Sequence, residues 1–155
     1  MLNIYIDADA CPVKEETYKV ANRYQLNVFV IANQYIQVPL DSKIEMKIVA
    51  GGFDSADDWI AEHIEVGDIL ITSDLLLADR CLKKKARVLG SKGKELDDEN
   101  IGNVLGGREL MSHLRDLGQT KTGPSAMTKS DRSQFLSKLD QIIQSLIRLN
   151  GNKIK

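Results

Sequence analysis

Apolar positions in the first 90 residues alternate between short continuous runs and helical spacing. Continuous runs rich in β-branched residues predict buried strands at 2–6, 26–33 and 68–74. The segment 44–51 alternates apolar and polar positions and predicts a further strand, and a short fifth strand is expected at 86–90. The pattern therefore indicates a sheet of four or five strands.

Between these strands, apolar residues recur at the spacing of a helix. The spacing predicts a helix beginning at Pro12, a second over 56–64 and a third over 75–84. Asp54 or Ser55 supplies the N-cap of the second helix. Because repeated strand–helix–strand units imply parallel strands joined by right-handed crossovers, we predict an α/β three-layer sandwich with a mostly parallel sheet.

The remainder of the chain changes in character. Residues 91–100 predict a polar loop, and 101–118 a glycine-broken start followed by an amphipathic helix. Residues 119–131 have no apolar periodicity, which predicts a flexible loop. Asp131 then caps a final helix at 132–150, which carries one apolar stripe. This loop and helix form a helical C-terminal extension.

Composition places the chain among ordinary globular proteins. Its 155 residues suit one domain with a core over 1–118, and 43% of them are hydrophobic and 28% charged. No apolar run approaches the roughly 20 residues of a membrane span. The N-terminus lacks the pattern of a signal peptide, and two cysteines without a CxxC motif fit a reducing compartment. We therefore expect a cytoplasmic protein that does not contact membranes.

The net charge of −1 conceals an asymmetry between the two halves. Residues 1–80 hold 14 acidic against 6 basic side chains, and residues 81–155 hold 8 against 15. Two interpretations stay open: two solvated halves of opposite sign, or an acidic pocket for cations bordered by a basic surface for polyanions.

Aspartates gather where the predicted strands end. Ligands of open parallel sheets bind outside the carboxyl ends of the strands. We predict a metal site there, with the ligands Asp7, Asp9, Asp57, Asp58, Asp74 and Asp79. Each acid alone could cap a helix or face water, but carboxylates crowded together require a proton or a cation. Oxygen ligands without a cluster of Cys and His favour Mg²⁺ or Mn²⁺ over zinc.

Such a site suits hydrolysis of a phosphodiester, because the metal neutralises the phosphate and activates water. We expect nucleic acid as the partner, with RNA ranked ahead of DNA. The candidate phosphate-binding residues are Thr72, Ser73, Lys14, Lys92, Arg108 and Arg132. The simpler alternative assigns the hydroxyls to helix caps and the basic residues to solvated surfaces.

Several motifs together resemble a known family. DADACPVK (7–14), GDILITSDLLLA (67–78) and GPSAMTKSDRSQFLSKLD (123–140) resemble the YaiI/YqxD family of small bacterial proteins. That family is similar to the PIN-like nuclease superfamily. The resemblance implies a PIN-like fold and a metal-dependent ribonuclease-like site.

The same resemblance implies which acids are catalytic. They are Asp7, Asp74 and Asp57 or its neighbour Asp58, and Asp79 is a candidate fourth. Many PIN domains carry a further acid in the helix after the first strand. Glu15 and Glu16 are available for that position, and the sequence leaves open which of them faces the site.

Two other functions stay open at this point. A haloacid-dehalogenase-like phosphatase would use Asp7 as nucleophile, although the glycine and threonine expected after its DxD motif are replaced by Ala10 and Cys11. A non-catalytic RNA-binding or regulatory module would keep the fold without turnover. The sequence does not indicate the oligomeric state.

Overall fold

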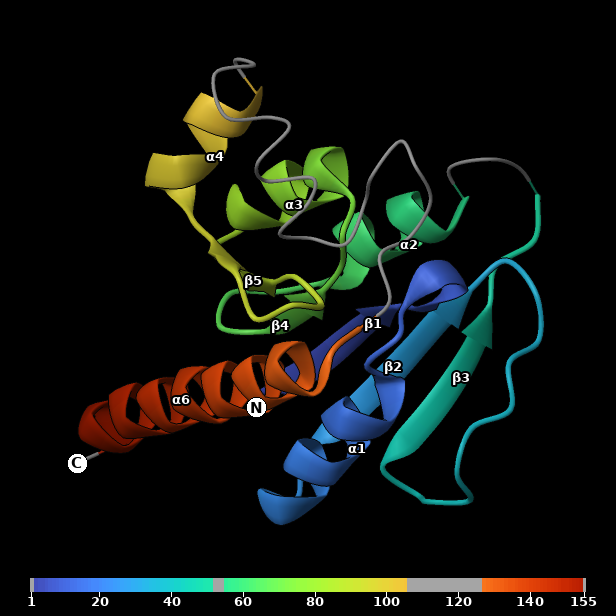
Figure 1. Cartoon of the computed structure of the whole chain (residues 1–155), viewed down its shortest axis with the longest axis horizontal. Coiled ribbons are helices and arrows are strands. Elements are labelled where there is room, and N and C mark those ends of the chain that lie inside the picture. The colour runs from blue at the N-terminus through green and yellow to red at the C-terminus, as the bar shows by residue number, and fades with distance from the viewer. Residues whose placement is uncertain (1, 52–54, 106–126, 155) are drawn as a thin grey trace.

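A six-stranded sheet forms the centre of the molecule (Figure 1). The computed structural model describes residues 2–51, 55–105 and 127–154. The strands are β1 (Asn3–Asp7), β2 (Asn27–Ala32), β3 (Ile44–Ile48), β4 (Ile69–Ile71), β5 (Arg87–Leu89) and β6 (Glu95–Leu96). Their order is β3-β2-β1-β4-β5-β6. The strands β1 to β5 are parallel, and β6 pairs with β5 in the antiparallel sense.

Helices cover both faces of this sheet (Figure 1). They are η1 (Ala8–Ala10), α1 (Lys14–Arg23), α2 (Ser55–His63), α3 (Leu75–Leu82), α4 (Asp98–Leu105) and α6 (Lys129–Ile154). One apolar core lies between the sheet and α1 with α6, and the other between the sheet and α2, α3 and α4. The predicted α/β class, the mostly parallel sheet and the C-terminal helix are thereby confirmed. Within the described residues, every helix is too short or too polar to reach across the apolar interior of a bilayer.

The central strands are apolar on both sides because both sides are covered. In β1, Ile4 and Ile6 enter the core under α1 and α6, while Tyr5 enters the opposite core. In β4, Ile69 and Ile71 alternate with Leu70 in the same way. This two-sided burial explains the continuous apolar runs of the sequence.

The segment predicted as a polar loop over 91–100 holds regular structure. A turn in which Gly90 N donates to Lys94 O at 2.9 Å leads back into β6. Leu96, which is almost fully buried, fixes this short strand. Asp97 then precedes α4 and accepts a hydrogen bond from Asn100 N at 2.9 Å. The buried Leu96 therefore fixes β6 and the Asp97 cap begins α4, although the sequence shows no apolar periodicity in this segment.

The C-terminal helix begins earlier than the sequence pattern predicts. Thr128 N donates to Asp131 Oδ2 at 3.1 Å, and Asp131 N donates to Thr128 Oγ1 at 3.0 Å. This reciprocal capping box makes Thr128 the cap, so the prediction that Asp131 caps a helix starting at 132 is corrected. The parts of the predicted helix and loop that fall within 106–126 lie outside the described residues.

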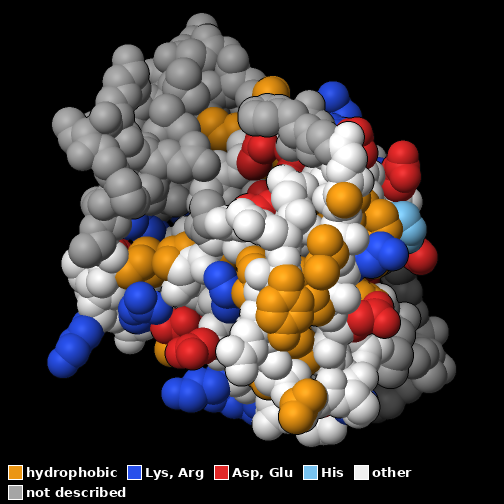
Figure 2. Space-filling model, turned by 90° about the vertical axis from the view of Figure 1, so that its right-hand side faces the viewer, with side chains coloured by type: hydrophobic (Ala, Val, Ile, Leu, Met, Phe, Trp, Pro, Cys, Tyr) orange, Lys and Arg blue, Asp and Glu red, His pale blue; other side chains and the backbone are white. Residues whose placement is uncertain are grey.

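The strands β6 and β3 form the two edges of the sheet. The side chains of β3 are mostly exposed or half-buried. Seen from this side, hydrophobic side chains gather in the middle of the face, with acidic and basic side chains around them (Figure 2). The large exposed hydrophobic residues of β3 and its preceding connection are Tyr35, Leu40 and Ile48. No helix joins β2 to β3; an irregular connection over 33–43 does so instead.

Candidate active site at the switch point of the sheet

The strand order reverses direction between β1 and β4. From β1 the chain proceeds to β2 and β3 on one side, and later to β4 and β5 on the other. In parallel sheets this point leaves a crevice at the carboxyl ends of the two strands. Asp7 is the last residue of β1, and the neighbouring β4 ends at Ile71, opposite Ile6. The residues that follow Ile71 therefore lie beside Asp7.

Thr72 connects the two strand ends. Its hydroxyl Oγ1 donates to Asp7 Oδ2 at 2.7 Å and accepts from Asp74 N at 3.0 Å. Asp74 Oδ1 in turn accepts from Leu76 N at 2.9 Å and from Leu77 N at 3.1 Å, as the N-cap of α3. One buried hydroxyl thus fixes the Asp7 carboxylate and the backbone of Asp74.

The surroundings of Asp7 disfavour the ionised form of its carboxyl. Burial raises the pKa of its carboxyl above the usual range, and the negative charges of Asp74 and Asp9 raise it further. The hydrogen bond from Thr72 acts in the opposite direction, because it stabilises the ionised form. A positive charge bound here would remove the penalty, so Asp7 is the carboxylate of this site that gains most from a cation.

The structure distinguishes between the paired acids of α2. Asp58 is exposed, and Arg80 Nη1 of α3 donates to its Oδ1 at 3.0 Å. Asp57 is half-buried, and its charge acts together with that of Asp7 on the Cys81 thiol. Burial is the main cause that raises the pKa of this thiol to about 12, with Asp57 and Asp7 adding to the rise. The charges of Asp57 and Asp7 are therefore both felt at the Cys81 thiol.

The remaining predicted ligands have other partners. Both oxygens of Asp9 accept a hydrogen bond from Asn33 N, at 3.2 and 3.1 Å, where β2 has ended. Asp79 Oδ2 lies 3.0 Å from Lys83 Nζ, one helical turn further along. Asp9 still contributes to the field at Asp7. Asp7 and Asp74 are thus the pair that the two strand ends bring together.

A second hydroxyl pair extends the site toward β5. Ser73 Oγ lies 3.3 Å from Ser91 Oγ, and Ser91 is almost fully buried just after β5. Sequence reasoning identified Thr72 and Ser73 but missed Ser91. The available signal was its position after the apolar run 86–90, where a parallel strand delivers its next residue to the same edge.

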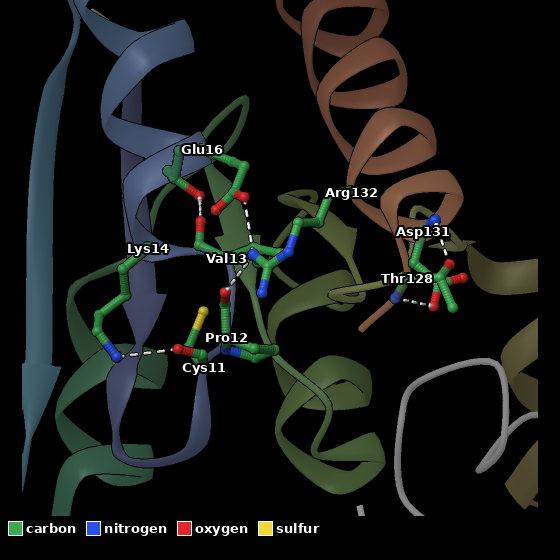
Figure 3. Close-up of polar contacts among 9 residues, drawn as sticks. Cys11, Pro12, Val13, Lys14, Glu16, Thr128, Asp131 and Arg132 are labelled. Atoms are coloured by element: carbon green, nitrogen blue, oxygen red, sulfur yellow. Dashed lines mark hydrogen bonds and ion pairs between the residues drawn. The ribbon is translucent and has the colours of Figure 1, made fainter. Parts of the chain in front are cut away.

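Two of the predicted basic residues line a pocket beside the turn after β1. Lys14 Nζ donates to Cys11 O at 2.9 Å, and Arg132 Nη1 donates to Pro12 O at 3.0 Å and to Glu16 Oε2 at 2.7 Å (Figure 3). The pocket has a volume of about 490 Å³. Its lining consists of Cys11, Pro12, Lys14, Glu15, Glu16 and Arg132.

The contact of Arg132 also fixes the start of α6 against α1 (Figure 3). Glu16 thereby forms an ion pair with Arg132. Glu15 and Glu16, the two candidates for a further acid in the helix after the first strand, both line this pocket. Lys92 lies close enough to lower the pKa of Asp131, after the larger effect of the hydrogen bonds from Thr128. Arg108 lies outside the described residues.

The donor set is suited to a hard cation with few protein ligands. Among the described residues, no three Asp, Glu, His or Cys side chains converge as a complete metal-binding group. Asp7 and Asp74 each keep one oxygen outside the hydrogen bonds given above, and the Thr72 hydroxyl contacts the Asp7 carboxylate. Mg²⁺ typically binds through one or two carboxylates together with water and substrate phosphate. Asp7 and Asp74 fit that mode.

Fold and geometry define an α/β protein with the acidic residues Asp7 and Asp74 side by side at the switch point of its sheet. A family model described as "Uncharacterized BCR, YaiI/YqxD family" matches residues 5–145. The chain belongs to this YaiI/YqxD family, as its motifs predict.

Curated relatives agree with this assignment along nearly the whole chain. A UPF0178 protein of Rhodospirillum centenum is 49% identical over 152 residues, covering 96% of this chain and 99% of its own. A UPF0178 protein of Rhodopseudomonas palustris is 50% identical over 147 residues, with 95% of each chain covered. One from Paramagnetospirillum magneticum is 49% identical over 149 residues, covering 96% and 99%. No solved structure matches the chain.

Proposed function

We propose that the protein is a divalent-metal-dependent phosphodiesterase that cleaves nucleic acid, with RNA as the preferred substrate class. One observation carries the proposal: Asp7 and Asp74 meet at the switch point, with Thr72 hydrogen-bonded to both. We further propose that the fold is PIN-like, since an acid ends β1, another stands in α2 and a third follows β4.

Asp7 and Asp74 would hold Mg²⁺ or Mn²⁺ through the oxygens that Thr72 and the α3 backbone leave available. When bound, such an ion supplies a polarised water and neutralises phosphate charge. Thr72 keeps the Asp7 carboxylate and the Asp74 backbone in place before substrate arrives, and the N–H groups of Leu76 and Leu77 hold the Asp74 carboxylate. Such pre-organisation is what catalysis requires. Asp57 adds negative charge from α2.

The substrate backbone would approach past the hydroxyls and the basic residues. Ser73 and Ser91 place two hydroxyl oxygens at the ends of β4 and β5. Lys14 holds its ammonium group at the wall of the pocket beside Cys11. Ammonium and hydroxyl groups of this kind bind phosphate oxygens without selecting a base.

The test is cleavage of a fluorescently labelled single-stranded RNA in Mn²⁺, resolved on a denaturing gel. We expect cleavage by the wild type and a loss on the order of 100-fold in Asp7→Asn and in Asp74→Asn, because each removes one pre-organised charge. Asp74→Asn keeps the cap of α3, since asparagine caps as well as aspartate. Asp58→Asn, which changes an exposed acid of α2, is the matched control and should retain activity.

Unchanged cleavage in both variants would remove the proposal. Wild-type protein that binds RNA with no cleavage would support the binding-module alternative instead. A covalent aspartyl-phosphate trapped on Asp7 would support the phosphatase alternative.

A further inference from the structure

The outer edge of β3 carries backbone groups that no other strand pairs within the described residues. Among the described residues, β3 pairs only with β2. Val28 N donates to Lys43 O at 2.8 Å, and Val49 N donates to Ala32 O at 2.8 Å. Because backbone groups of alternate residues point to opposite sides of a strand, odd-numbered residues of β3 face β2. Met46 and Ile48 point their backbone groups away from the sheet, where a further strand can pair, whereas Ile44 N donates to Asp41 O at 3.1 Å.

The side chains of this edge are self-complementary. The strand reads Ile44, Glu45, Met46, Lys47, Ile48. If a second copy pairs in the antiparallel sense about Met46, each Glu45 stands opposite Lys47 of the other copy. Ile44 then stands opposite Ile48, and the outward backbone of Met46 pairs with its own equivalent. Opposite charges directly across a pair of strands are stabilising.

Other alignments of the same edge are repelled. Antiparallel pairing centred on Glu45 sets Glu45 against itself, and pairing centred on Lys47 sets Lys47 against itself. Parallel in-register pairing opposes like charges at both positions, which is destabilising. Glu45 and Lys47 are both exposed, and neither forms a salt bridge within the described part of the chain. Their charges are therefore available to select one register.

Apolar surface lies beside this edge. Ile48 is 46% exposed, and Tyr35 is 70% exposed in the connection that leads to β3. Leu40, four residues before β3, is fully exposed. Exposed hydrophobic side chains gathered on one face mark an interaction surface.

From these observations we propose that β3 pairs with β3 of a second copy of this chain, antiparallel about a two-fold axis through Met46. The interface is isologous, so both copies use the same surface. It joins the two sheets into one continuous sheet. Because β2 separates β3 from β1, Asp7 lies outside the interface in each copy.

Sedimentation of the full-length protein over a range of concentrations tests the pairing. We expect a wild-type dimer, and a dissociation constant raised roughly tenfold in Glu45→Lys and in Lys47→Glu, since each turns two attractive pairs into repulsive ones. The double variant Glu45→Lys/Lys47→Glu should regain the wild-type value. Mixing the two single variants should yield a heterodimer, because all their facing charges are then opposite. Glu62→Lys, an exposed acid on α2, is the control.

A second variant is independent of charge. Met46→Pro removes the outward N–H, which takes no part in the β2 pairing, and proline is accepted on edge strands for this reason. It should yield a monomer whose circular dichroism matches the wild type. A wild-type monomer at all concentrations would overturn the proposal. So would a dimer that every charge variant leaves unchanged, because the copies would then meet through another surface.

Discussion

At the scale of single residues, the site depends on how one carboxylate is held. Asp7 accepts a hydrogen bond from Thr72 and is repelled by Asp74 and Asp9. Its raised pKa means that ionisation is less favourable in the folded chain than in the unfolded chain. The fold therefore loses stability as the pH rises through the pKa of Asp7, and the loss persists at neutral pH. Acidic sites commonly trade stability for function in this way.

The substitution Asp7→Asn tests this balance. We expect the variant to melt at a higher temperature than the wild type at pH 7, because the penalty of the buried charge is gone. The difference should shrink as the pH falls toward the ordinary range of aspartate, where the wild-type carboxyl is protonated. Thermal melting by circular dichroism at several pH values measures it. Added Mn²⁺ should raise the melting temperature of the wild type and leave that of Asp7→Asn unchanged.

Asp58→Asn provides the comparison, since this exposed carboxylate pairs with Arg80. Its melting temperature should differ little from the wild type at any pH, because exposed ion pairs contribute little. A variant Asp7→Asn that is less stable than the wild type at pH 7 would show that favourable contacts outweigh repulsion at this carboxylate.

At the scale of elements, the sequence predicted best those strands and helices in which burial imposes a repeating pattern of apolar residues. The strands β2 and β4 lie within the predicted runs, and β1 extends one residue beyond its run, because strands buried on both faces are continuously apolar. The elements β6 and α4 were not predicted, because they depend on Leu96 and on a single cap rather than on a repeating pattern. The start of α6 was misplaced by a few residues, since Thr128 and Asp131 both have side chains that cap helices.

Gly93 shows how one turn positions α6. Its φ is +88°, and a Cβ there would lie 2.9 Å from the backbone carbon of Gln134. We expect Gly93→Ala to lower the free energy of unfolding by about 1–3 kcal/mol, since both the backbone strain and the clash oppose it. Urea unfolding measures the change.

Two further glycines separate the causes of that change. Gly67→Ala tests strain alone, since its φ is +81° and nothing lies within 4 Å of its Cβ position. Gly102→Ala, with open space in α4, should stabilise the protein by roughly 0.5–1 kcal/mol. If Gly93→Ala cost no more than Gly67→Ala, the close approach of α6 would not matter.

At the scale of the whole molecule, parallel topology made the site partly predictable. The carboxyl ends of β1 and β4 share one edge, so the proximity of Asp7 and Asp74 follows once the strands are known to be neighbours. The partner of Asp58 does not follow, because Arg80 reaches it only through the packing of α2 against α3. Ser91 was missed because only the turn after β5 brings it to Ser73.

The charge asymmetry leads to a last prediction, on the affinity for RNA. If the basic surface follows a phosphate backbone, the logarithm of the affinity should fall linearly with that of the salt concentration. Lys14→Ala should reduce the slope by about one, because among the described residues its ammonium group donates to a carbonyl oxygen and forms no salt bridge. Arg132→Ala should reduce it less, because Glu16 already neutralises that guanidinium. Fluorescence anisotropy with a labelled RNA measures both slopes.

Lys19→Ala, an exposed lysine elsewhere on α1, serves as the matched control. Equal slopes for Lys14→Ala and Lys19→Ala would mean that RNA does not pass the pocket beside Cys11.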